Sequence, residues 1–198
     1  MIRYKKNPRS SNKLVVIEVD GKKYWAKYIG KGQFSKVYRV GDRVVYYTKG
    51  DCGKEVLSLY VYDKTTHLPE IIRHENITKP GVTWWVFSSP YYRNVTSKDR
   101  SAYQLMNVII AEYNKFRREY THYQQQAYGR IKDGYILMYA FVEYGRGRFP
   151  GSIVNVLYSL VELARSCGDN IGFDFKKNNF GVNEYGTLIL RDVIWVWG

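Results

Sequence analysis

The chain has 198 residues, of which 45% are hydrophobic and 25% charged, a composition typical of folded domains rather than disordered segments. Its formal net charge of +13 favours an acidic partner, such as nucleic acid, an acidic protein surface or a phosphate-rich ligand, or it reflects a solvated basic surface. We expect no membrane-spanning stretch, no signal peptide and, with only Cys52 and Cys167, no disulfide or metal framework, which favours a cytoplasmic protein.

The first half of the chain predicts an antiparallel β-meander followed by further strands. β-Branched and aromatic runs between glycine-containing turns predict strands at 14–19, 24–29, 36–40, 43–48, 71–78 and 82–88. A short helix is predicted between the fourth and fifth of these strands, over residues 55–62.

The second half changes to helical spacing. Apolar and aromatic residues recur at this spacing over 97–126 and predict a long helix there. A second amphipathic helix is predicted over 152–167, with Ser152 as its N-cap and Gly168 as its C-terminal cap.

Two further segments complete the layout. The apolar run 135–141 fits either a strand or a helix, and two strands are expected around the turn at 183–186. Strands first, helices second and a final hairpin predict an α+β fold with two lobes. We expect a β-rich lobe over 1–90 and a helical lobe over 91–198, within one domain.

A glycine-rich segment, GKGQFSKV at 30–37, lies between two of the predicted strands. Glycines let a backbone approach phosphates closely and point N–H groups at them. A dinucleotide-binding loop or a P-loop would run from a strand into a helix, so neither motif matches this context. The segment resembles the protein-kinase glycine-rich loop G-x-G-x-x-G-x-V, with Ser35 at the third glycine. The alternative is an ordinary hairpin with glycine in its turn.

A second segment, GFDFKKNN at 172–179, follows the predicted capped helix. It resembles the kinase catalytic loop H-R-D-L-K-x-x-N, with Asp174 at the catalytic aspartate and Asn179 at the metal-binding asparagine. Downstream, Asp192 stands where the family places the aspartate of its D-F-G motif. Taken singly, these residues also fit a solvated loop carboxylate, a turn asparagine and a strand end.

The two segments together are similar to the small serine/threonine protein kinases of T7-like bacteriophages, which share the G-x-G-x-F-S loop and the Phe-Asp pair. The resemblance implies a minimal kinase-like fold that binds ATP and Mg²⁺ and transfers the γ-phosphate to Ser or Thr hydroxyls of host proteins in the host cytoplasm. It also implies that basic charge steers the enzyme to acidic host complexes. The site residues it implies are Asp174 and Lys176 for catalysis, Asn179 and Asp192 for the metal, and Gly30, Gly32, Ser35, Val37, Lys49 and Glu55 for the nucleotide.

The chain departs from the kinase pattern at the strand lysine that contacts the α- and β-phosphates. The expected position holds Tyr46 or Tyr47. Lys49 lies two residues beyond Tyr47, on the same face of a strand, and is our candidate for a pair with Glu55. The alternative is that the lysine is lost.

Other departures concern regulation and substrate binding. Phe173 replaces the catalytic-loop arginine, which predicts no activation-loop switch, and Gly172 replaces the histidine. No A-P-E segment follows Asp192, so we expect substrates to be recognised by the region 97–130 or by the basic surface.

Alternative functions remain open at this point. A pseudokinase that binds and inhibits a host protein would keep the fold without the lysine. A basic nucleic-acid-binding protein would use exposed Tyr and Trp for stacking, although no nucleic-acid motif is visible. A small-molecule phosphotransferase would share the catalytic residues.

Overall fold

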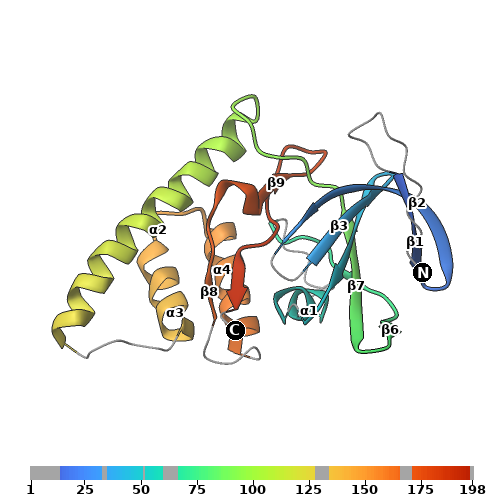
Figure 1. Ribbon diagram of the computed structural model, residues 1–198. Coiled ribbons are helices and arrows are strands. Elements are labelled where there is room, and N and C mark those ends of the chain that lie inside the picture. The colour runs from blue at the N-terminus through green and yellow to red at the C-terminus, as the bar shows by residue number, and fades with distance from the viewer. Residues whose placement is uncertain are drawn as a thin grey trace. The chain divides into compact units, whose positions relative to one another are not determined.

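The computed structural model describes residues 14–32, 35–50, 52–59, 67–127, 134–165 and 171–196. Within these ranges the chain forms two compact units (Figure 1). The first unit holds strands β1 to β7 and helix α1, and the second holds residues 67–69 and the elements from α2 onward. Helices and antiparallel strands together give the α+β class that the sequence predicts.

The first unit is built on one antiparallel sheet with the strand order β1-β2-β3-β4-β7-β5, and β6 also pairs with β7. Its elements are β1 (Leu14–Val19), β2 (Lys22–Lys31), β3 (Ser35–Val40), β4 (Arg43–Thr48), α1 (Cys52–Leu59), β5 (Ile72–Arg73), β6 (Ile77–Lys79) and β7 (Val82–Pro90). The β1–β2 and β3–β4 hairpins turn at Gly21 and Gly41, whose φ angles of 72° and 59° favour glycine. The predicted meander is therefore confirmed, while the predicted end of α1 at residue 62 lies outside the described residues.

The strand predicted over 71–78 is divided into β5 and β6. Both parts pair with β7, and the His74 N–H still donates to the Val86 carbonyl oxygen at 2.8 Å, but residues 75 and 76 are not paired with β7. His74 contacts Ser88 Oγ at 2.8 Å through Nε2 and Asp20 Oδ2 at 2.7 Å through Nδ1. The backbone N–H of Glu75 donates to Asp20 Oδ1, and this bond is the main reason that the pKa of Asp20 is lowered. Side-chain hydrogen bonds to a distant turn thus replace strand pairing at this point.

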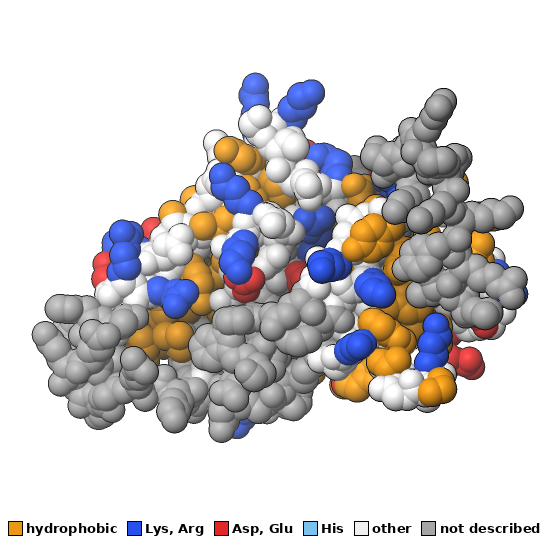
Figure 2. Space-filling model, in the orientation of Figure 1, with side chains coloured by type: hydrophobic (Ala, Val, Ile, Leu, Met, Phe, Trp, Pro, Cys, Tyr) orange, Lys and Arg blue, Asp and Glu red, His pale blue; other side chains and the backbone are white. Residues whose placement is uncertain are grey.

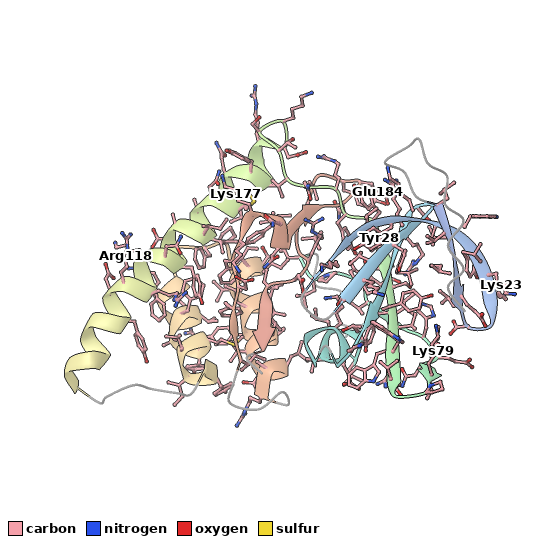
Figure 3. All side chains as sticks on the ribbon, viewed as in Figure 1. Lys23, Tyr28, Lys79, Arg118, Lys177 and Glu184 are labelled. Carbon is pink, nitrogen blue, oxygen red and sulfur yellow. The ribbon has the colours of Figure 1, made fainter. Side chains whose placement is uncertain are left out.

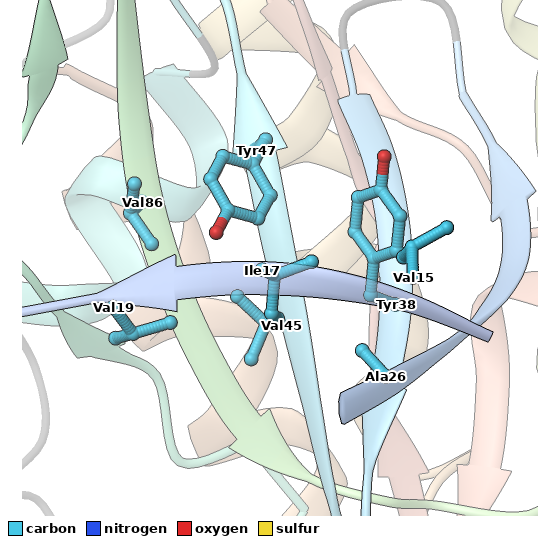
Figure 4. Close-up of a cluster of buried hydrophobic side chains, with 8 residues drawn as sticks. All are labelled: Val15, Ile17, Val19, Ala26, Tyr38, Val45, Tyr47 and Val86. Carbon is cyan, nitrogen blue, oxygen red and sulfur yellow. The ribbon is translucent and has the colours of Figure 1, made fainter. Parts of the chain in front are cut away.

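The core of the first unit lies on one face of its sheet, where β1 packs over β4 and β7 (Figure 4). The buried side chains of this cluster are Val15, Ile17, Val19, Ala26, Tyr38, Val45, Tyr47 and Val86. Tyr47 brings a polar atom into this core, and its hydroxyl donates to the Glu18 carbonyl oxygen at 2.6 Å. Burial raises the pKa of Tyr47 to about 12.

We expect Tyr47→Phe to lower the free energy of unfolding by about 1 kcal/mol at neutral pH, because a buried hydrogen bond is lost. A group with a raised pKa contributes stability that is complete below its unfolded pKa of about 10 and is lost as pH rises through the folded value. The difference between wild type and variant should therefore shrink as pH rises from about 10 to about 12. Urea unfolding at neutral and alkaline pH measures this difference, and a constant difference would contradict the assignment.

The second unit combines three helices with two short antiparallel strand pairs, β9 with β10 and β8 with β11. Its elements are α2 (Arg100–Ala127), α3 (Gly134–Gly145), α4 (Gly151–Ala164), β8 (Ile171–Phe173), the 3₁₀ turn η2 (Lys177–Asn179), β9 (Phe180–Val182), β10 (Leu188–Leu190) and β11 (Ile194–Val196). The hairpin predicted around 183–186 is confirmed as β9 and β10. The pairing of β8 with β11 was not predicted.

The ambiguous run 135–141 is helical and forms most of α3. Its residue Phe141 is fully buried in an aromatic cluster with Tyr113 and Phe116 of α2, with ring centroids 5.0 and 5.4 Å away. Phe173 of β8 joins the same cluster at 6.0 Å from Phe141. The run 135–141 is therefore helical because it packs between α2 and β8. The sequence alone did not decide between strand and helix.

The start of α4 differs from the prediction. The helix begins at Gly151 with Pro150 at the N-cap position, and Ser152 makes no capping bond. The Ser152 hydroxyl instead lies 3.3 Å from Nε2 of the buried His67, whose Nδ1 contacts the Leu188 carbonyl oxygen at 2.8 Å. Because a carbonyl oxygen only accepts, Nδ1 carries the proton and Nε2 accepts from Ser152. The predicted cap Gly168 lies outside the described residues.

On the face drawn in Figure 2, basic side chains are spread out rather than gathered in one block. Lys and Arg are scattered over the face shown in Figure 2, with fewer Asp and Glu among them. Examples labelled in Figure 3 are Lys23 of the first unit and Arg118 and Lys177 of the second. None of the helices in the described ranges combines the length and the apolar character needed to cross a lipid bilayer.

Candidate functional site

The position of Asp174 is fixed by the strand pair β8 and β11. Asp174 directly follows β8, and its backbone N–H donates to the Val193 carbonyl oxygen at 2.8 Å. The preceding Phe173 carbonyl accepts the Tyr113 hydroxyl at 2.8 Å. The backbone on both sides of the peptide bond is therefore held, which limits the positions that the Asp174 carboxylate can reach.

Three of the predicted site residues lie together around this carboxylate. Lys176 Nζ lies 3.0 Å from Oδ1 and 3.1 Å from Oδ2 of Asp174. Asn179 Nδ2 donates to Asp174 Oδ2 at 3.0 Å and to the Asp174 carbonyl oxygen at 2.7 Å. A carboxylate, an ammonium and an amide thus form one hydrogen-bonded group within six residues of sequence (174–179).

The orientation of the Asn179 amide follows from its partners. Both contacts of Nδ2 are to acceptors, so the NH₂ group must face them. The amide oxygen then points away from Asp174 and makes no hydrogen bond to another described residue. The Asn179 amide oxygen is therefore available to a metal ion, next to the carboxylate of Asp174.

Asp192 is brought next to Asn179 through the backbone. The Asn179 carbonyl oxygen accepts from the N–H groups of Arg191, at 2.9 Å, and Asp192, at 3.3 Å. The Asp192 side chain is exposed. The two residues that the kinase resemblance assigns to the metal therefore lie side by side in the fold, although thirteen positions separate them in sequence (192 − 179).

Oxygen ligands of this kind suit Mg²⁺, which is commonly bound through one or two carboxylates together with phosphates and water. The described residues hold no cluster of three or more His, Cys, Asp or Glu side chains that would bind a metal unaided. The Asn179 amide oxygen and the Asp192 carboxylate fit a magnesium ion that arrives with a nucleotide.

Buried aromatic side chains pack against one another on both sides of Asp174 in the sequence. Phe173 and Phe175 are buried and stacked, with centroids 4.8 Å apart, and Phe175 also packs on Tyr113 at 4.9 Å and on Phe180 at 6.0 Å. Phe173 therefore belongs to the hydrophobic core, and its position, where kinases carry an arginine, offers no cation to a phosphorylated loop.

Arg191 is a residue of the site that the sequence analysis missed. Its guanidinium donates to the carbonyl oxygens of Tyr92 at 2.8 Å and Asn178 at 2.7 Å, and to Asn94 Oδ1 at 3.0 Å. It also lies over Gly181, where an added Cβ would come within 2.8 Å of Arg191 Cδ. The only signal in the sequence was a charged residue between the apolar strand β10 and Asp192.

The glycine-rich segment forms a strand–turn–strand in the first unit, as predicted. Gly30 lies in β2 directly after a shift in its register with β3, Ser35 and Val37 lie in β3, and the Gly32 N–H donates to the Ser35 carbonyl oxygen at 2.8 Å. Residues 33 and 34 lie outside the described residues. An added Cβ at Gly30 or Gly32 would meet nothing within 4 Å, and neither has a left-handed φ. Packing against described residues therefore does not require glycine at either position, and the backbone there is open to a ligand.

The predicted pair of Lys49 and Glu55 does not form. Glu55 Oε1 accepts from Arg73 at 2.7 Å, and Lys49 Nζ lies 4.9 Å from the ring centroid of Trp84. The reason is that Lys49 follows Tyr47 on the face of β4 that carries the core, where Trp84 packs at the edge of the cluster. Lys49 is therefore not the partner of the helix glutamate.

No protein-family profile and no curated protein sequence matches the chain. The likeness to the phage kinases therefore depends on the two motif segments alone.

Proposed function

We propose that the chain is an ATP- and Mg²⁺-dependent protein kinase that phosphorylates Ser or Thr hydroxyls. The observation that carries this proposal is the group formed by Asp174, Lys176 and Asn179, with Asp192 beside it. Phosphoryl transfer needs positioning and charge neutralisation rather than covalent help from the protein, and this group offers both. The two units would then be the two lobes of one kinase-like domain.

Each residue has a role that its contacts support. The Asp174 carboxylate orients the attacking hydroxyl and accepts its proton, while Lys176, with its ammonium at 3.0 Å from that carboxylate, offsets negative charge on the transferring phosphoryl group. Asn179 and Asp192 would hold Mg²⁺, which when bound neutralises the phosphate oxygens. In the first unit, the backbone around Gly30 and Gly32 is open to phosphates, and Val37 offers apolar surface to the base.

The expected substrates follow from charge. A chain with a formal net charge of +13 attracts acidic surfaces, and long-range attraction raises the rate of encounter with them. We therefore propose acidic protein complexes as substrates, in a host cytoplasm if the phage likeness holds.

A pseudokinase is the second candidate. The absence of the strand lysine favours it. Tyr46 or Tyr47 stands where that lysine is expected, and the expected Lys49–Glu55 pair is absent. Such a protein would bind nucleotide or a host protein without transferring phosphate.

One experiment separates these candidates. The purified chain is incubated with γ-labelled ATP and Mg²⁺, with acidic casein as substrate and basic histone for comparison, and with EDTA as a control. Mg²⁺-dependent label on Ser or Thr of casein supports the kinase. A rise in melting temperature with ATP but no label supports the pseudokinase, and the absence of both effects would contradict any nucleotide-binding role.

A further inference from the structure

The strand residues that the kinase resemblance assigns to the nucleotide form one row across the sheet of the first unit. Gly30 pairs with Val37, Val37 with Tyr46, and Tyr46 with Phe87. Directly paired residues of neighbouring strands carry their side chains on the same face, about 4.8 Å apart from strand to strand. The nucleotide face of this sheet is therefore the face of Val37 and Tyr46.

This face offers no cation from β4 itself. Tyr46 presents a phenol, whose hydroxyl lies 3.2 Å from Ser89 Oγ. Side chains alternate along a strand, so Val45 and Tyr47 point to the opposite face, where Figure 4 shows them in the core cluster. Lys49 belongs to that opposite face, because its ammonium lies over Trp84, which packs against the same cluster.

Helix α1 supplies a lysine to the nucleotide face. Lys54 lies in the first turn of α1, and its Nζ is 5.0 Å from the ring centroid of Tyr46. Lys54 is only 5% exposed, so its side chain lies within the first unit rather than in solvent. An aromatic ring attracts an ammonium that lies over its face, so Tyr46 helps to hold Lys54 in place.

A second observation on the same face points to a ligand. Thr48 follows Tyr46 by two positions and so shares its face of β4. The residue is fully buried, and its Oγ1 has no hydrogen-bond partner among the described residues. Buried hydroxyls are almost always paired, so an unpaired one on this face is expected where a polar ligand binds.

We propose that Lys54 provides the ammonium that contacts the α- and β-phosphates of the nucleotide, in place of the strand lysine that the chain lacks. The cation comes from the helix next to the sheet, passes over the Tyr46 ring and reaches the same row of residues as Gly30 and Val37. This inference rests on the proposed nucleotide-binding function. It removes the main objection to an active kinase, since the missing strand cation is supplied by another element.

An acyl-phosphate derivative of ATP tests the assignment directly. The unprotonated amine of a lysine beside the phosphates attacks the acyl carbon, forming an amide N–C bond while the C–O bond to the phosphate breaks. ATP leaves, and the ammonium proton is released to solvent. Peptide mass spectrometry then identifies which lysine has been acylated, and a parallel reaction with excess ATP shows which acylation ATP prevents.

We expect ATP-protected acylation at Lys54 and unprotected or no acylation at Lys49 and Lys36, which both lie over Trp84. ATP-protected acylation at Lys49 or another lysine, with none at Lys54, would overturn this assignment and leave the proposed function standing. If ATP protects no lysine and does not raise the melting temperature, the proposed function fails as well.

A matched pair of variants gives an independent measurement of ATP affinity. Lys54→Met should weaken ATP binding about 10- to 100-fold, the loss expected for one charge-assisted hydrogen bond. Lys49→Met removes the same charge from the opposite face and should leave the Kd for ATP unchanged. Binding is measured by titration with a fluorescent ATP analogue, after circular dichroism has shown that both variants are folded. Equal effects of the two substitutions would overturn the assignment.

Discussion

Asp174→Asn should lower kcat for protein phosphorylation by about 100- to 10,000-fold while ATP still binds. Asn keeps the shape of the side chain and can still accept from Lys176 and Asn179, which lie at 3.0 Å from the carboxylate oxygens. It cannot accept the proton of the attacking hydroxyl. The Asp174 N–H donates to the Val193 carbonyl oxygen, and the Phe173 carbonyl oxygen accepts from the Tyr113 hydroxyl. Neither bond involves the Asp174 side chain, so the loop should keep its position.

The measurement is the initial rate of casein phosphorylation at saturating ATP, together with the ATP-induced rise in melting temperature. Lys177→Gln is the matched control, because Lys177 is exposed in the same loop and belongs to none of the contacts around Asp174. The control should keep its rate within a small factor. A fully active Asp174→Asn variant, or an equal loss in Lys177→Gln, would remove Asp174 from the proposed mechanism.

Gly134→Ala should lower the free energy of unfolding of the second unit by about 1–3 kcal/mol, the usual cost of forcing extra atoms into a packed site. An added Cβ at Gly134 would lie 1.6 Å from the backbone carbonyl oxygen of Ile171. That carbonyl belongs to β8, which is paired with β11 and cannot move aside alone. Asp174 follows β8 directly, so any shift of the strand should also reduce phosphorylation activity.

Gly151→Ala is the control, since Gly151 begins α4 as Gly134 begins α3. Nothing lies within 4 Å of an added Cβ at Gly151, and its φ is not left-handed. Alanine there should be neutral or should stabilise by up to about 1 kcal/mol, because it restricts the unfolded chain. Urea unfolding of both variants decides the matter, and a neutral Gly134→Ala would mean that α3 and β8 are not in the close contact described.

Local patterns predicted most of the fold because they report on burial. The apolar, β-branched run of β1 and the Asp20-Gly21 turn predict the first hairpin, and the structure adds its register, in which Val15, Ile17 and Val19 point to the core. The helix predicted over 97–126 is found at Arg100–Ala127 for the same reason. These elements bury one face wherever they pack, so neighbours far away in sequence were not needed to predict them.

Long-range partners decided what local patterns could not. The strand expected over 71–78 is interrupted because His74 bonds to Asp20 and Ser88, neither of which is close in sequence. Ser152 gives its hydroxyl to His67 rather than to the start of α4. In both cases the side chain bonds to a residue that is distant in sequence, and such a partner cannot be predicted from the local pattern.

The candidate site divides in the same way. The sequence predicted which residues gather around Asp174, because spacings of two and five positions let Lys176 and Asn179 reach its carboxylate within one turn of chain. The sequence predicted Lys49 for the nucleotide and did not indicate Lys54; the tertiary structure shows that Lys54 lies over Tyr46 and Lys49 over Trp84. The face on which a side chain lies depends on strand pairing and on where a helix packs, and both are set by contacts across the whole unit.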